Sequence, residues 1–219
     1  PGQRHAAGFD RPAWVLAGSD NSLSIIDAKS VPQQRLASID AARPIFALPD
    51  SSAEATRLAG SDAAARLEAT VLTLTAAYLL GLSARLLELT VLYTEQRFQF
   101  GRAIGSFQAV KHKLADVATG VELARPSMWV AAHRIDRNDP QAPLSALVAK
   151  AFATRIARLA NEAALQCHGA MGFTMEFDLH MWLKRGKVME QFYGAPTAVT
   201  SRIAAELLAT PSADLGVRP

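Results

Sequence analysis

The sequence has few of the residues that build covalent or metal-based sites. Its 219 residues include one cysteine, Cys167, and five histidines. A single cysteine excludes an internal disulfide and any site with several cysteine ligands, so we expect no metal site and a reducing, cytoplasmic location. The 23 Lys+Arg exceed the 20 Asp+Glu by only three charges, and they are scattered along the chain. A nucleic-acid-binding surface needs a larger and more clustered positive charge.

The features of a secreted or membrane-spanning protein are also missing from the printed sequence. The chain begins Pro1-Gly2-Gln3, without an initiator methionine or the basic and apolar segments of a signal peptide. No apolar run is long enough to suggest a bilayer crossing, so we expect no membrane span. We interpret the N-terminus as a cut or incomplete start. Because 50% of the residues are hydrophobic, the chain can still bury one sizeable core or two small ones.

The pattern of residues changes near position 60. Residues 1–58 alternate short apolar runs (AWVLAG, SLSIID) with Gly, Pro, Asn and Asp, a pattern typical of short strands, and GSDNS predicts a hairpin turn. Ala63 to Gln96 contains no proline and repeats apolar residues every three or four positions, which predicts a helix of over thirty residues with an N-cap at Ser61-Asp62. We therefore predict a partial β-domain over 1–58 and a helical bundle domain over 61–209.

Four further helices are expected in the second region. They span about 106–136, about 144–166, 179–191 and 197–209. Ser106 is the expected N-cap of the first of these, and Pro126 should kink it or free a carbonyl. One face of the next helix is expected to be Val148, Phe152, Ile156, Leu159, Ala163 and Gln166. On the long first helix, Val71, Leu74, Tyr78 and Leu82 are expected to face either the bundle interior or the apolar chain of a ligand, and the interior is the preferred interpretation. The fold class is therefore mainly α, with a short N-terminal β segment before an up-down helical bundle.

Two motifs carry a resemblance to a known family. RFQFGRAIGSFQAVKHKLADV, which begins at Arg97, is similar to a pattern of Arg-x-x-Phe-Gly with a later Gln, and LQCHGAMGFTMEF, from Leu165, is similar to a Leu-Gln-x-x-Gly-Gly-x-Gly pattern. Together, in this order and among long helices, they resemble the C-terminal half of the acyl-CoA dehydrogenases, which are FAD-containing enzymes. The resemblance covers residues 60–208 well. It implies the C-terminal helical domain, preceded by the end of the middle β-domain.

The resemblance implies a set of cofactor-binding residues. Arg97 would hold the FAD pyrophosphate of a neighbouring subunit, because a guanidinium matches paired phosphate oxygens. Phe100 and Gln108 would lie beside the adenine and ribose. A second contact would come from Gln166, Gly169 and Ala170, where the family usually has two adjacent glycines, and Thr197 would also contact the cofactor. The alternatives are a solvated arginine, a core phenylalanine and an ordinary glycine helix cap. His168, which has no metal partners, is interpreted as structural.

The catalytic base is where this sequence departs from the family pattern. Many members have a glutamate in the segment that corresponds to EQFYGAPTA, and here Tyr193 occupies that position. A phenol, with a reference pKa of about 10, is a poor general base near neutral pH. Other members carry the base on the first long helix, where Glu68 is the nearest carboxylate. An exposed helix carboxylate is the alternative for Glu68, so the catalytic residue is left unassigned.

Three functional hypotheses follow. The first is an FAD-dependent dehydrogenase that oxidises a fatty or sterol-side-chain acyl-CoA to the enoyl-CoA. The second is a catalytically silent subunit that supplies FAD contacts to a partner in a hetero-oligomer. The third, more remote, is a helical interaction or nucleic-acid-binding module. The first two imply a homo- or hetero-tetramer with FAD at subunit interfaces, an acyl-CoA substrate, and an acceptor such as electron-transfer flavoprotein.

Overall fold

The computed structural model describes residues 4–7, 14–19, 22–48 and 55–209. The chain divides into two compact units, residues 1–68 and 69–219, with the boundary inside the first helix. Each unit is described by itself. The first carries six of the eight described strands, and the second carries nearly all of the helical residues, which confirms the predicted mainly α class with a short N-terminal β segment.

The first unit contains two small antiparallel sheets. Their strands are β1 (Arg4–Ala7), β2 (Trp14–Ser19), β3 (Ser22–Asp27), β4 (Gln34–Leu36), β5 (Ile45–Leu48) and β6 (Ala55–Gly60). One sheet has the order β1-β5-β4 and the other β2-β3-β6. Ser19 pairs with Ser22, so β2 and β3 form the hairpin predicted from GSDNS, whose tip lies outside the described residues. Ile26, Ala28, Val31 and Leu48 form the buried core of this unit.

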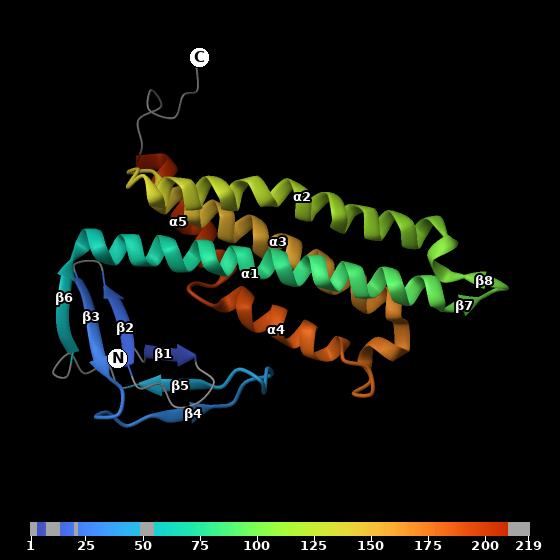
Figure 1. The fold of residues 1–219 in the computed structure, drawn as a ribbon, viewed down its shortest axis with the longest axis horizontal. Helices are drawn as coiled ribbons and strands as arrows, with labels where there is room; N and C mark the ends of the chain where they lie inside the picture. The colour runs from blue at the N-terminus through green and yellow to red at the C-terminus, as the bar shows by residue number, and fades with distance from the viewer. Residues whose placement is uncertain (1–3, 8–13, 20–21, 49–54, 210–219) are drawn as a thin grey trace, which may run out of the picture. The chain divides into compact units, whose positions relative to one another are not determined.

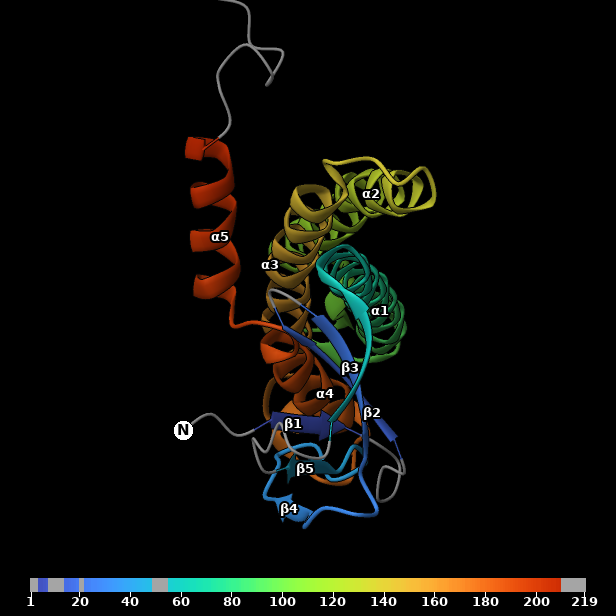
Figure 2. The same cartoon turned by 90° about the vertical axis from the view of Figure 1, so that its left-hand side faces the viewer.

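The helices of the second unit form a bundle. They are α1 (Ser61–Gln96), α2 (Gln108–Asp136), α3 (Ala142–His168), α4 (Leu179–Gln191) and α5 (Pro196–Ala209). Figure 1 shows α1, α2 and α3 running lengthwise beside one another, and Figure 2 shows the same three helices nearly end-on. Buried residues of α1, α2, α3 and α4 share one core. The predicted helices are confirmed to within about two residues at each end.

Helix α1 buries several hydroxyl groups without leaving them unpaired. The hydroxyls of Thr73, Thr75, Ser83 and Thr90 each donate to the carbonyl four residues earlier, at 2.6–2.8 Å. A buried polar group is tolerated when it is hydrogen-bonded, and this local bond needs no partner from another helix. By length and composition α1 could cross a membrane, but half of that segment is buried inside the bundle, as in the core helix of a soluble protein.

The core face of α3 differs from the predicted one. Val148 and Gln166 are exposed, whereas Ile156 is buried together with a row of alanines: Ala146, Ala149, Ala153, Ala157, Ala160, Ala163 and Ala164. Of the predicted face, Ile156 and Ala163 are buried and Phe152 and Leu159 pack against the core, so the prediction is right in part. Most of the other buried apolar positions of α3 are alanines. The prediction was also wrong for Leu74 and Tyr78 of α1, which are exposed, and right for Leu82, which is buried.

One local expectation for the start of α2 needs correction. The helix begins at Gln108 after Phe107, and Ser106 lies in a short 3-10 segment where its hydroxyl donates to the carbonyl of Ala103 at 2.7 Å. Ser106 is therefore not the N-cap of α2. Pro126 lies at an exposed position inside α2, which continues across it, so the kink or freed carbonyl expected at this proline stays a prediction.

Two glycines give a matched pair of stability predictions. A Cβ on Gly186 of α4 would lie 2.6 Å from Asn161 Nδ2 of α3, whereas a Cβ on Gly81 of α1 would meet nothing within 4 Å. We expect Gly186→Ala to lower the free energy of unfolding by about 1–3 kcal/mol through overpacking. Gly81→Ala should raise it by up to about 1 kcal/mol, because alanine favours the helix. Denaturant unfolding of both variants checks this, and equal effects would contradict the α3–α4 packing.

Candidate functional site

The first motif forms a hairpin that follows the end of α1. Strands β7 (Phe98–Gln99) and β8 (Arg102–Ala103) pair around Phe100 and Gly101. Both turn residues have positive φ angles, +55° and +77°, as a two-residue type I′ hairpin requires. The side chain of Phe100 is 92% exposed, so the interpretation of Phe100 as a core residue is wrong. The rings of Phe100 and Phe107 are nearly perpendicular, with their centroids 6.2 Å apart.

Arg97 and Gln108 lie at the two ends of this connection. The Arg97 amide bonds to the carbonyl of Tyr93 at 2.9 Å, and the Arg97 carbonyl accepts from Ile104 at 2.8 Å, which ties the hairpin to the end of α1. Gln108 is the first residue of α2. Both side chains are exposed. Within the described ranges, neither the guanidinium nor the amide has a hydrogen-bond or ion-pair partner, so both are available to a ligand.

The second motif forms the end of α3. Gly169, with φ +58°, donates its amide to the carbonyl of Leu165 and starts a 3-10 segment, Gly169–Phe173. A glycine takes this backbone conformation at little cost. A Cβ on Gly169 would meet nothing within 4 Å, so the backbone conformation, and not a lack of space, is what favours glycine there. Gln166, Gly169 and Ala170 are all exposed, which leaves this backbone open to an approaching group.

An aromatic contact brings the two motifs together. The rings of Tyr93 and His168 stack with centroids 4.1 Å apart, and the Tyr93 hydroxyl donates to the carbonyl of His168 at 3.4 Å. Tyr93 lies one helical turn before Arg97, and His168 directly precedes Gly169. Phe177 closes the cluster, 5.1 Å from the His168 ring. The first motif begins 68 residues before the second in sequence, yet the hairpin and the end of α3 both lie at one end of the bundle, at the right in Figure 1.

His168 has a structural role in this cluster. Its Nδ1 lies 2.7 Å from the carbonyl of Ala164, and burial lowers the pKa of His168 below its usual range. The ring is therefore neutral at physiological pH. No group of three or more His, Cys, Asp or Glu in the described part of the chain could hold a metal ion. Tyr93 and Phe177 were missed by sequence reasoning, because their contact partners lie far along the chain.

Tyr193 and Thr197 occupy a different part of the second unit. They flank the turn between α4 and α5, and α5 packs on α3 through Val199. Tyr193 has φ +56° and is 52% exposed, and Thr197 is exposed in the first turn of α5. The hairpin of the first motif lies at the opposite side of Figure 1 from the label of α5. Thr197 is therefore not gathered with the other predicted cofactor residues. Glu68 is exposed near the start of α1, in the first unit.

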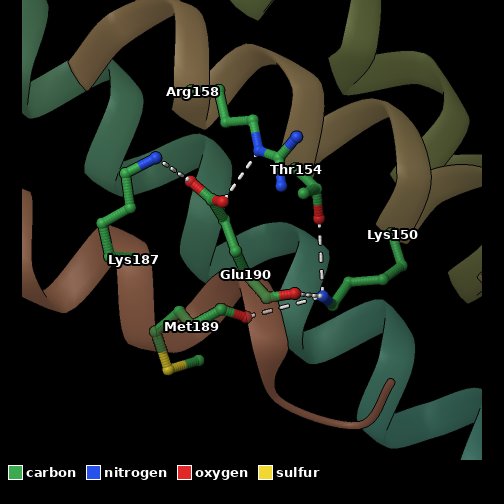
Figure 3. Close-up of polar contacts among 6 residues, drawn as sticks. All are labelled: Lys150, Thr154, Arg158, Lys187, Met189 and Glu190. Atoms are coloured by element: carbon green, nitrogen blue, oxygen red, sulfur yellow. Dashed lines mark hydrogen bonds and ion pairs between the residues drawn. The ribbon is translucent and has the colours of Figure 1, made fainter. Parts of the chain in front are cut away.

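A buried ionic cluster lies directly before this turn (Figure 3). The carboxylate of Glu190, with its side chain 2% exposed, accepts from Arg158 Nε at 2.8 Å and from Lys187 Nζ at 3.4 Å. Lys150 of α3 is buried beside the backbone of the same glutamate. Neither Lys150 nor Glu190 was singled out from the sequence, because a lysine and a glutamate on amphipathic helices are expected to face water.

The comparisons with known proteins agree on one family. The family model described as "Acyl-CoA dehydrogenase, C-terminal domain" matches residues 73–208. The chain is 35% identical over 142 residues to the acyl-CoA dehydrogenase IpdE2 of Mycobacterium tuberculosis, covering 65% of this chain and 43% of that protein. It therefore spans less than half the length of this relative.

Solved structures give the same result. A variant of the Tcur3481-Tcur3483 steroid ACAD aligns with a TM-score of 0.80 and 26% identity, covering 90% of this chain and 56% of that chain. The ChsE4-ChsE5 complex from Mycobacterium tuberculosis aligns with a TM-score of 0.79 and 28% identity, covering 91% of this chain and 56% of that chain. The similarity includes the β segment as well as the bundle.

Proposed function

Because this chain belongs to the acyl-CoA dehydrogenase family through its C-terminal domain, we propose that it acts in the FAD-dependent α,β-dehydrogenation of an acyl-CoA thioester. The observation that carries the proposal is the meeting of the two motifs at one end of the bundle, through the stacked rings of Tyr93 and His168. The name of the steroid ACAD among the structural relatives supports a sterol-side-chain or fatty acyl group as the substrate.

The residues at this end of the bundle fit a dinucleotide. The unpaired guanidinium of Arg97 suits a pyrophosphate, and the free amides of Gln108 and Gln166 can both donate to and accept from ribose or adenine. The open backbone at Gly169 allows close approach. When bound, FAD would supply the acceptor for the hydride that leaves the substrate. The chain's own residues would hold and orient the FAD. Because Arg97, Gln108 and Gln166 are exposed, they suit a cofactor that is shared with a neighbouring subunit.

A second candidate function is that of a catalytically silent subunit. The observation that favours it is Tyr193, a half-exposed phenol at the position where many family members carry the glutamate base. The carboxylate nearest to it in sequence, Glu190, is buried and bound by Arg158 and Lys187. The printed name of the ChsE4-ChsE5 complex shows that a relative is found with a second polypeptide. We propose a tetrameric cytoplasmic assembly, homo- or heteromeric, with electron-transfer flavoprotein as acceptor.

Flavin stoichiometry tests these functions. Visible absorbance against chain count, with intact mass on the same sample, gives the flavin per polypeptide in the native assembly. One flavin per copy in a homo-oligomer supports the dehydrogenase, and half occupancy with a second polypeptide supports the silent subunit. An assembly that contains no flavin and takes up none from added FAD would contradict both.

Substitutions at the two base candidates give a further prediction. We expect Tyr193→Phe and Glu68→Gln each to leave the dehydrogenation rate of the native assembly within about twofold, because neither side chain removes the substrate proton. Removing a true general base typically costs about 10²- to 10⁴-fold. Steady-state rates with one acyl-CoA and an artificial electron acceptor would check this. A loss of that size in Glu68→Gln would instead assign the base to this chain.

A further inference from the structure

The C-terminal end of α4 rests on a buried ammonium group (Figure 3). Lys150 of α3 is only 1% exposed. Its Nζ donates to the carbonyls of Glu190 and Met189, at 3.0 and 3.5 Å, and to the hydroxyl of Thr154 at 3.4 Å. An ammonium has three N–H donors, and here it meets three acceptors. The last carbonyls of a helix have no partner within the helix, and they favour a cation. Lys150 therefore acts as a cap supplied by another helix.

Burying the charged ammonium of Lys150 costs free energy, which points to a specific role for this cap. Burial lowers the pKa of Lys150 to about 8, and the negative charge of Glu190 opposes that shift. A buried ion pair often stabilises a fold no better than well-packed apolar residues of the same size would. An apolar side chain could fill the same space, but the ammonium forms directional hydrogen bonds. These bonds fix the carbonyls of Met189 and Glu190 relative to α3. Arg158 and Lys187 fix the glutamate side chain in the same way.

The turn that follows is held from its other side by the same helix. Phe192 donates its amide to the Met189 carbonyl at 3.3 Å, and the chain then turns through Tyr193 and Gly194, both with positive φ. A Cβ on Gly194 would lie 3.2 Å from Val199 Cγ2 of α5. Val199 is buried in a cluster with Ala146 and Leu147 of α3. The end of α4 before the turn and the start of α5 after it thus both contact α3, within residues 146–150.

We propose that Lys150 is the positioning residue of the turn formed by residues 192–195, fixing where the side chain of Tyr193 stands. The importance of that position rests on the proposed function, in which residue 193 occupies the base position of the family. Lys150 is not a catalytic residue, since it contacts the turn's supporting helix and not Tyr193 itself. Gly194 belongs to the same arrangement, because the absence of a side chain there leaves room for Val199.

The test uses the three tyrosines of the chain, Tyr78, Tyr93 and Tyr193. The intact protein is labelled with fluorotyrosine, and each ¹⁹F resonance is assigned by a Tyr→Phe substitution. Lys150→Met keeps the length of the side chain and removes its three donors. We expect the Tyr193 resonance to shift or split by more than its line width, while the resonance of Tyr93, at the far end of the bundle, stays in place.

A matched control and a second measurement keep the test decisive. Thr154→Val removes one acceptor of Lys150 but leaves the α4 carbonyls bound, so Tyr193 should not move. An unchanged Tyr193 resonance in folded Lys150→Met, or equal shifts at all three tyrosines, would overturn the proposal. If that variant does not fold, hydrogen exchange on the unaltered protein decides: the Phe192 amide should be as protected as the last turn of α4, and unprotected exchange would overturn the proposal. Neither result depends on flavin content, so failure here is distinct from failure of the proposed function.

Discussion

Replacing Arg97 with alanine is expected to weaken FAD retention in the native assembly by about 10- to 100-fold, since a hydrogen bond to a charged group contributes about 1.5–3 kcal/mol. The guanidinium is exposed and has no partner within the described ranges, so its removal takes nothing from the fold. Its proposed role is to hold a pyrophosphate, which alanine cannot do. Equilibrium dialysis or flavin fluorescence on dilution would measure the change in the FAD dissociation constant.

The matched control is Arg85→Ala on the same helix. Arg85 pairs with Glu88 at 2.9 Å on an exposed face, away from both motifs. Such surface pairs contribute little, so Arg85→Ala should leave both stability and flavin binding nearly unchanged. Equal flavin binding in the two variants would show that Arg97 is only a solvated arginine at the end of α1. Loss of helicity in Arg97→Ala would mean that the fold, and not the cofactor contact, had been tested.

Replacing Glu190 with alanine is expected to lower the free energy of unfolding by about 3 kcal/mol, the scale for removing one partner of a buried ion pair. The side chains of Arg158 and Lys187 are about half exposed and can be hydrated when the carboxylate is removed, so breaking their ion pairs costs little free energy. The buried Lys150 cannot do so, and it loses the carboxylate that compensates its charge. Denaturant unfolding followed by circular dichroism, at fixed protein concentration, would measure the difference.

Glu162→Ala is the control for this second prediction. Glu162 lies on α3, as Lys150 and Arg158 do, but its side chain is exposed. Substitutions at exposed positions usually change stability by about 0.5 kcal/mol or less. A similar small change in Glu190→Ala would show that the cluster in Figure 3 adds little to the fold. In that case Lys150 would not need a compensating charge.

The extents of the helices could be predicted because their signals are local. A proline-free repeat of apolar residues predicted α1, and the glycines after residue 166 predicted that α3 ends near there, two residues before its observed end at His168. The buried faces were harder to predict. Leu74 and Val148 fit an apolar period but are exposed, and the alanines of α3 form the core in their place. A repeat of apolar residues every three or four positions identifies a helix. Which face of that helix is buried depends on the segments packed against it, and the sequence alone does not reveal them.

The candidate site was predicted only in part for the same reason. Arg97, Gln108 and Gly169 were recognisable because their motifs are continuous in sequence. That the motifs meet depends on the stacking of Tyr93 on His168, 75 residues apart in the chain. The cluster of Lys150 and Glu190 had no motif at all, since its members are ordinary helix residues until two helices bring them together.

The sequence by itself determined the family, the order of the helices and which polar residues the two motifs contain, because those depend on residue type and short spacing. Only the tertiary structure decided which faces are buried and which distant motifs share one end of the bundle. It also decided which charged side chains are withdrawn from water. The physical reason is that burial, and the cost of burying a charge, depend on what other parts of the chain place around a residue.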